Sequence, residues 1–533
     1  MKNIISKLFV GVVCASSLFT TTSCIDETFP TNLITEDQVT SSAKATEALL
    51  WAMPAYLNKY NSYVGTHYDW GYGSIMHIRD VMTGDFAVVS HTYDQYNYWQ
   101  INKYQGNTYI FSQFIWNYYW PLVQTENNVI KAIDPATATE PLLGYLGAAQ
   151  AFRAMTYLDM AQMYEFLPND VTSNINASGN DVLNLTVPIV RETITEEESR
   201  NNPRVSRDVM AEFILADLDS AEKNIPYLDI AAKTLPHLDV VYGLKARCYM
   251  WLEDYENAKK YARLAIDETS VQPMDSTACI NPQSGFNQLN KWMWGSQMVK
   301  EEDVVQSGIL NWTAWASNEA KYGYAGAGPM NMIDAKMYNR LNDTDFRKQM
   351  FKAPAKHALS GSEAYIDLEH AEKIPTYGSL KFRPNAGDAN ESSVGSASAY
   401  PLMRVEEMYF IEAEAAEHLA AGEGVALLEN FMKTYRDEAY VFPAGTDAVD
   451  EIVFQKRVEL WGEGLSFFDI KRLDLPVNRG YIGTNFKSTA RFNTKGRPAW
   501  MNFCIVVTEE RNNAALKGYE NPDPSDKYKV WSE

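Results

Sequence analysis

The chain has 533 residues and a formal net charge of −21, with 68 acidic side chains against 47 lysines and arginines. This acidic balance argues against a nucleic-acid partner, because neutralising phosphates requires clustered Lys and Arg. A chain of this length can hold two or more domains. Its 32 Tyr, 22 Phe and 13 Trp fill a core or supply ligand platforms.

The N-terminal sequence predicts a secretory signal peptide. Lys2 and Lys7 precede a largely apolar run over residues 8–20, and such a run with a basic flank is typical of an export signal. It is too short to span a bilayer permanently. No later stretch is long and apolar enough to do so, and we therefore expect the rest of the chain to be soluble once it has been exported.

The signal ends at Cys24, in a pattern similar to a bacterial lipoprotein signal. Thr21 stands where such signals usually carry Leu. We expect residues 1–23 to be removed and Cys24 to be lipidated, since several acyl chains together give a stable anchor. Asp26 and Glu27 resemble the surface-export signal of some Gram-negative lipoproteins. The prediction is a lipid anchor in the outer membrane, facing the cell exterior.

Helical periodicity dominates several segments, with apolar residues at i, i+3, i+4 and i+7. Residues 240–251 and 255–266 approximate a tetratricopeptide repeat, because Ala246, Tyr249 and Ala258 stand where small and aromatic residues let helices interlock. The sequence therefore predicts a mainly α fold. The other predicted helical segments are 148–164, 206–223, 401–436 and 451–461.

Four long segments lack a clear period and are rich in Tyr, Trp, Asn, Gly and Asp. Loops of this length within a compact protein are usually functional. We therefore expect a helical scaffold that carries long irregular insertions. The segments are 62–108, 279–330, 352–400 and 473–533.

An ordered set of motifs along the chain resembles the SusD/RagB family. The most specific block is Arg457-x-Glu459-Leu460-x2-Glu463-Gly464-x3-Phe468-Asp469, in which Gln455 and Ser466 depart from the family's usual charged residues. The other motifs are Trp116-x3-Trp120-x2-Val123-x3-Asn127, Arg153-Ala154-x2-Tyr157-Leu158, Val187-Pro188, Arg204-Val205-Ser206, Asp217-Leu218, Asp345-x-Arg347, Arg404-x-Glu406, Ala413-Glu414-Ala415 and Glu509-x3-Asn513.

This resemblance implies a non-enzymatic nutrient-binding lipoprotein. It implies one SusD-like domain over residues 24–533, with tetratricopeptide-like helices within about 112–270 and 401–472 and ligand-loop insertions at about 62–108 and 279–330. The implied partner is a SusC-like TonB-dependent outer-membrane transporter, to which captured oligosaccharides would be delivered. Two alternatives stay open: RagB-like capture of peptides, and a secreted glycoside hydrolase.

Two insertions combine aromatic rings with amide and acidic side chains, as a sugar site requires. Stacking on flat ligands of this kind contributes roughly 1–3 kcal/mol per ring. The competing interpretation is that these rings pack the loops onto the scaffold. The candidate ligand-binding residues are Tyr96, Tyr98, Trp99 and Asn102 in the first region, Trp312, Trp315, Tyr322 and Tyr324 in the second, and Trp70 in a Gly-rich stretch.

Charged residues near the C-terminal block could in principle act as acid–base pairs. At these helical spacings we instead expect ion pairs that hold helices together. Glu459 and Glu463 share a helix face and require cationic partners, such as Arg457 or Lys471.

No catalytic residue, metal or cofactor is expected. The histidines lack metal-ligand spacing, and no phosphate-binding, dinucleotide or nucleophile-elbow motif occurs. Cys248, Cys279 and Cys504 show no CxxC spacing, so at most one disulfide could form among them.

Overall fold

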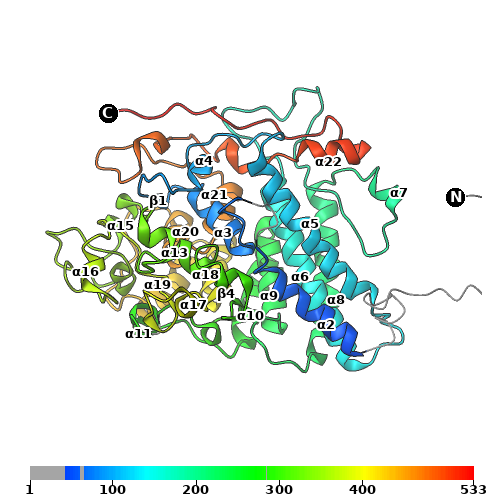
Figure 1. Cartoon of the computed structure of the whole chain (residues 1–533), viewed down its shortest axis with the longest axis horizontal. Coiled ribbons are helices and arrows are strands. Elements are labelled where there is room, and N and C mark those ends of the chain that lie inside the picture. Colours follow the sequence, from blue (N-terminus) through cyan, green and yellow to red (C-terminus); the bar gives the residue numbers. More distant parts are fainter. Residues whose placement is uncertain (1–42, 61–64, 284) are drawn as a thin grey trace, which may run out of the picture.

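The computed structural model describes residues 43–60, 65–283 and 285–533. The predicted signal peptide and Cys24 lie outside these residues. The described part is mainly helical, as predicted, with a few short strands (Figure 1). Within it, no helix is long and apolar enough to cross a membrane.

The longer helices cover the segments in which the sequence shows helical periodicity. Ser206 caps one of them by accepting a hydrogen bond from the Val209 N–H, as its position before the periodic run requires. These helices are α6 (Glu140–Tyr164), α8 (Arg207–Asn224), α9 (Leu238–Trp251), α10 (Tyr255–Glu268), α18 (Val405–Leu419), α19 (Glu423–Tyr435) and α20 (Ala448–Glu459). Further long helices outside those periodic segments are α2 (Ala43–Tyr56), α3 (Tyr72–Val81) and α5 (Ile110–Lys131).

The predicted tetratricopeptide-like pair is present as the hairpin α9–α10. Its turn places Glu253 in the left-handed region at φ 59°, and the Asp254 carboxylate accepts from the Asn257 N–H at 3.1 Å to begin α10. Helix α10 packs against both α9 and α18, and α18 in turn packs against α19 and α20. A second hairpin, α18–α19, thus extends the helical scaffold.

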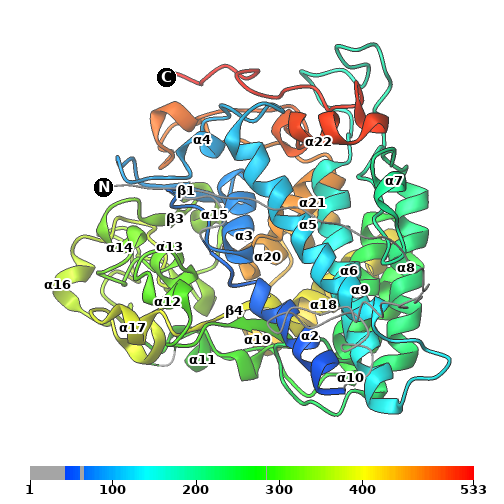
Figure 2. The same cartoon turned by 45° about the vertical axis from the view of Figure 1, so that its right-hand side comes forward.

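Helices α5, α6 and α8 run side by side in the right half of the molecule (Figures 1 and 2). Helix α6 is buried over most of its length, because α5 and α8 cover it from two sides. One hydrophobic core extends from Leu50 in α2 to Leu516 near the C-terminus.

The segments without periodicity contain short helices between irregular stretches. Helix α3 is the longest of those in residues 62–108, and it was not predicted. Every residue of α3 is buried, so it shows no alternation of apolar and polar faces. The short helices in these segments are α4 (Asn97–Gln100), α12 (Asp303–Gln306), α13 (Trp312–Ala316), α14 (Tyr324–Ala327), α16 (Leu368–Ala371), α17 (Ser392–Gly395) and α22 (Val507–Asn512). Short helices elsewhere are α7 (Glu196–Ser199), α11 (Ser276–Ile280), α15 (Ala335–Arg340) and α21 (Ser466–Arg472).

Two small antiparallel sheets join distant parts of the described chain. Strand β1 (Phe86–Val88) pairs with β3 (Asn331–Ile333), and β2 (Trp294–Gln297) pairs with β4 (Ala399–Met403). Strand β1 lies within the first predicted ligand-binding insertion, and β3 directly follows the second.

Candidate functional site

The β1–β3 pair brings the two predicted ligand regions together (Figure 2). Phe86 lies opposite Ile333 in the antiparallel register, and the Val89 N–H continues the ladder by donating to the Met330 carbonyl at 2.9 Å. The first region follows β1 along the chain and the second precedes β3. Because paired strands fix their flanking loops, the two regions meet at the same end of this sheet.

Two asparagines then fix α13 against β3. The Asn331 side chain donates to the Trp315 carbonyl at 2.7 Å, while the Asn318 side chain donates to the Asn331 carbonyl at 2.8 Å and accepts from its N–H at 2.8 Å. All of these groups are buried, where an unpaired amide would be costly. The second ligand region is therefore held rigidly.

Eight aromatic rings form a continuous row through both regions, which we call the aromatic spine. Ring centroids of consecutive members lie between 4.2 and 5.7 Å apart. Contacts of this geometry stabilise each pair by about 0.5–1.5 kcal/mol beyond the area they bury. In order, the spine comprises Tyr324, Trp315, Tyr96, Trp99, Phe111, Tyr98, Tyr104 and Tyr109.

The middle of the spine belongs to the core. Tyr96, Trp99 and Trp315 are all buried, so none of them offers a ring face to solvent. The Tyr96 hydroxyl shares a 2.8 Å hydrogen bond with that of Ser74, and burial raises the pKa of this phenol well above its usual value. These rings support the surface, and they cannot themselves stack on a ligand in this conformation.

The two ends of the spine reach the surface. At one end Tyr98, Tyr104 and Tyr109 are 39%, 40% and 38% exposed. At the other, the half-buried Tyr324 stacks on Trp315 at 4.2 Å and contacts Tyr93 at 6.4 Å. Tyr93 is 56% exposed. The solvent-facing rings are thus tyrosines, whose hydroxyl tips can also hydrogen-bond a polar ligand.

Three other predicted residues lie inside the scaffold. Trp70 and Trp312 are buried with ring centroids 6.3 Å apart, and Trp312 also stacks on Tyr400 at 5.0 Å. Asn102 is buried, and its side-chain amide donates to the Pro524 carbonyl at 2.9 Å. Their observed contacts fit the packing interpretation.

Tyr322 lies outside the spine. It is half-buried, and its hydroxyl accepts a 3.3 Å hydrogen bond from Ser396. Burial raises the pKa of this phenol above its ordinary value.

Polar groups flank the spine near α4. The Lys487 ammonium donates to the Asp94 carboxylate at 2.8 Å and to the Asn97 side-chain carbonyl at 2.7 Å. The Gln100 amide also donates to Asp94, at 2.9 Å. This ion pair ties a C-terminal lysine to the first ligand region.

Five of these residues were not predicted: Tyr93, Tyr104, Tyr109, Phe111 and Lys487. Tyr104 and Tyr109 carry a usable signal, since they bracket a turn that contains Gly and Asn. Rings in such a turn have little neighbouring chain to pack against. Lys487 has no local signal, because its partners lie nearly 400 residues earlier in the sequence.

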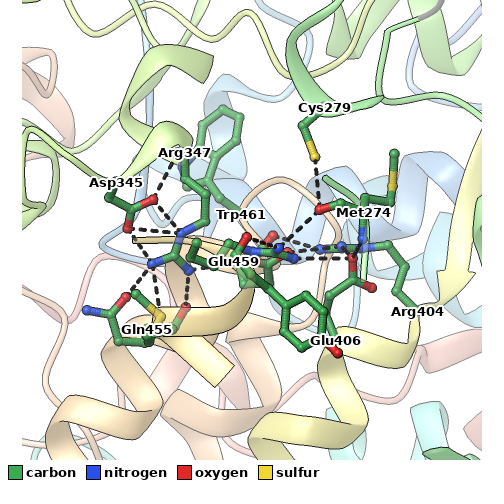
Figure 3. A network of polar contacts seen from close by, with 12 residues as sticks. Met274, Cys279, Asp345, Arg347, Arg404, Glu406, Gln455, Glu459 and Trp461 are labelled. Carbon is green, nitrogen blue, oxygen red and sulfur yellow. Dashed lines mark hydrogen bonds and ion pairs between the residues drawn. The ribbon is translucent and has the colours of Figure 1, made fainter. Parts of the chain in front are cut away.

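The charged residues of the C-terminal block form a buried network with partners from other segments (Figure 3). Glu459 accepts hydrogen bonds from Arg436 at 2.7 Å, from Arg404 at 3.0 Å and from Arg347 at 3.3 Å. Glu463 accepts from Lys381 at 2.6 Å and from Arg404 at 2.9 Å. The expected structural role is confirmed, since each carboxylate is enclosed and paired with cations.

The cationic partners predicted for Glu459 and Glu463 from the sequence, Arg457 and Lys471, are wrong. Arg457 pairs with Asp85, through Nε and Oδ2 at 2.9 Å, and so braces the residue before β1. Lys471 donates to the carbonyls of Met163 and Glu165 at 3.1 and 2.7 Å. Burial depresses the pKa of Lys471 well below its ordinary value. The cations that serve the glutamates instead come from positions 23 to 112 residues distant in sequence.

The described residues contain no group of three or more His, Cys, Asp or Glu side chains arranged to hold a metal ion. Cys248, Cys279 and Cys504 are buried free thiols. Burial raises the pKa of Cys248 to about 12, which keeps the thiol protonated and poorly reactive at neutral pH.

The chain matches a known family in sequence and solved proteins in structure. The SusD family model matches residues 274–528. No curated protein matches the sequence significantly.

Solved structures match almost the entire chain. A SusD-like carbohydrate binding protein from Bacteroides vulgatus is 21% identical, with a TM-score of 0.66 over 89% of this chain and 97% of that one. Surface glycan-binding protein A from Bacteroides uniformis is 16% identical, with a TM-score of 0.63 over 90% and 99%. A SusD superfamily protein from Bacteroides thetaiotaomicron is also 16% identical, with a TM-score of 0.65 over 90% and 99%. The resemblance to the SusD/RagB family is thereby confirmed: residues 274–528 match the SusD family model, and the chain has the SusD superfamily fold.

Proposed function

We propose that this protein is a cell-surface glycan-binding lipoprotein that captures oligosaccharides and delivers them to a SusC-like TonB-dependent transporter. The observation that carries the proposal is the aromatic spine. Its buried centre positions Tyr98, Tyr104 and Tyr109 at the surface without requiring a deep cleft. A row of partly exposed rings beside polar groups suits a ligand that has apolar faces ringed by hydroxyls.

Two matched structures support this assignment by their descriptions. One is a carbohydrate binding protein and another a surface glycan-binding protein. The net charge of −21 disfavours polyanionic ligands, so the proposed ligand is a neutral oligosaccharide.

We propose no catalytic role for the chain. A glycoside hydrolase needs two carboxyl groups flanking the scissile bond. Glu459 and Glu463, two carboxylates of the C-terminal block, are buried and paired with arginine and lysine side chains. They are therefore unavailable to a substrate. Asp469 is likewise paired, with Lys456 and Arg472.

Capture followed by delivery needs a tether at the membrane, which Cys24 would supply. A lid over a transporter acts through reversible affinity and release, so neither step requires bond chemistry. In this proposal the lipidated Cys24 keeps the protein on the outer face of the outer membrane, beside its SusC-like partner.

Isothermal titration of the purified protein against a panel of neutral oligosaccharides and a panel of peptides tests the ligand class. We expect oligosaccharide binding without release of reducing ends. Tyr98→Ala or Tyr104→Ala should weaken it roughly tenfold, since each stacked ring contributes about 1–3 kcal/mol. The matched control is Tyr227→Ala, because Tyr227 is 41% exposed but lies outside the spine.

Each other outcome points elsewhere. Peptide binding without oligosaccharide binding would favour the RagB-like alternative, and reducing-end release would favour a hydrolase. If Tyr98→Ala and Tyr104→Ala bound the oligosaccharide as tightly as the control Tyr227→Ala, the spine would not be the binding surface.

A further inference from the structure

A separate pocket of about 290 Å³ lies between α5, α7 and α22. None of its lining residues belongs to the aromatic spine. Trp120, which forms one wall, lies nine residues beyond Phe111 along α5, a distance of about 13–14 Å at the helical rise per residue. Val190, Arg200, Glu509 and Asn512 also line the pocket.

Hydrogen bonds between distant segments hold the pocket walls in place. The Asn202 N–H donates to the Asn513 side-chain carbonyl at 2.9 Å, and the Asn513 side-chain amide donates back to the Asn202 carbonyl at 2.7 Å. Ala514 N–H donates to the Arg200 carbonyl at 2.8 Å. The segment before α8 and the segment after α22 are therefore locked together, and a pocket with fixed walls loses little entropy when a ligand binds.

One wall of the pocket is aromatic and apolar. The half-buried Trp120 ring packs against Trp116 at a centroid distance of 5.1 Å, in an edge-to-face arrangement, and Val190 extends the apolar surface. Among the described residues, the Trp120 indole N–H has no hydrogen-bond acceptor. This N–H is enclosed, so what Trp120 offers a ligand is the apolar surface of its ring.

The remaining lining is polar and carries a slight excess of negative charge. Arg200 is already paired with Glu196, through Nη2 and Oε1 at 2.6 Å. The Glu509 carboxylate accepts from the Trp116 indole at 3.5 Å, and burial raises its pKa. Two glutamates and one arginine thus line the pocket, which disfavours an anionic ligand. Asn512 adds an amide at the exposed rim.

We propose that this pocket is a second binding site, for a single neutral pyranose: a free hexose or the end unit of a glycan. The volume lies just below the range of about 300–1,000 Å³ that drug-sized ligands occupy, and so suits one sugar ring. An indole wall with amide, carboxylate and guanidinium groups around it complements the apolar face and hydroxyl edge of a pyranose. The site is independent of the aromatic spine.

Saturation-transfer difference NMR on the purified chain tests the proposal with glucose, galactose, mannose and N-acetylglucosamine, each followed by titration. We expect at least one of these sugars to bind saturably, and glucuronic and galacturonic acid to bind at least tenfold more weakly. Two variants probe the pocket: Trp120→Phe, which replaces the indole wall by a smaller ring, and Asn512→Ala, which changes only an exposed side chain. Each should weaken binding at least threefold, whereas Tyr227→Ala, at an exposed tyrosine outside both the pocket and the spine, should leave it unchanged.

The outcomes separate cleanly. Circular dichroism and a thermal melt establish that both pocket variants fold like the wild type. The proposal is overturned if none of the four sugars binds, if Trp120→Phe and Asn512→Ala both bind as the wild type does, or if the uronic acids bind more tightly. Loss of monosaccharide binding in Tyr104→Ala would place the sugar on the spine, and would also overturn it.

Discussion

Replacing Glu459 by Gln tests whether the buried charge network holds the C-terminal helices together. The Glu459 carboxylate contacts the guanidinium groups of Arg347, Arg404 and Arg436, and every one of these side chains is at most 4% exposed. Gln keeps the shape but removes the negative charge. Breaking one partner of a buried ion pair costs about 3–5 kcal/mol, because the cations left behind are uncompensated.

The assay is urea unfolding at neutral pH, followed by tryptophan fluorescence. A loss of about 3–5 kcal/mol is a large share of the roughly 5–15 kcal/mol that stabilises a typical domain, so the midpoint should fall visibly. The matched control is Glu196→Gln, which removes an ion pair with Arg200 whose side chains are 81% and 66% exposed. Exposed pairs contribute about 0–1 kcal/mol. The reasoning is refuted if both variants lose the same stability.

The same network sets a pH dependence. Burial raises the pKa of Glu459, but the guanidinium groups of Arg436 and Arg404 more than offset this and hold it well below the ordinary range. A depressed pKa contributes stability above the unfolded-state value of about 4.3, and this contribution is lost as the pH falls through the folded-state value. The stability gap between wild type and Glu459→Gln should therefore narrow in acid below about pH 4.

Two further predictions concern the spine and the anchor. Trp315→Ala should destabilise the protein by about 3–5 kcal/mol, since it removes a large side chain that is 2% exposed. Replacing the exposed Tyr104 by Ala should cost under about 1 kcal/mol. If the two variants had equal melting temperatures, the centre of the spine would not be part of the core. Cys24→Ser should move the protein from the membrane fraction to the soluble fraction, as immunoblotting of the two fractions would reveal; retention in the membrane would place the anchor elsewhere.

The helical scaffold was predictable because its helices are periodic and end at recognisable residues. Residues 255–266 were expected as a helix, and α10 spans Tyr255–Glu268. Its start follows from Asp254, whose carboxylate satisfies an N–H that the helix leaves unpaired. Helix α3 was missed because burial on every side erases the period on which such a prediction depends.

The candidate ligand surface was predicted only in part. The two regions were found from their composition, but composition does not reveal which rings face solvent. Trp99 and Tyr98 are neighbours in sequence, yet the first is buried and the second is 39% exposed. What separates them is the packing of Trp99 against Tyr68 and Tyr96, contacts that require the fold. The partners of Glu459 were out of reach for the same reason.

The three-residue pairing of β1 with β3 has a consequence for how the protein acquires its activity. These strands lie nearly half the chain apart, and closing so long a loop is slow compared with forming a local helical hairpin. During synthesis, α5 to α10 can fold while the second ligand region is still emerging. The ligand-binding surface is therefore expected among the last parts of the molecule to form, so that a truncated or stalled chain would keep much of its helical scaffold and bind no ligand there.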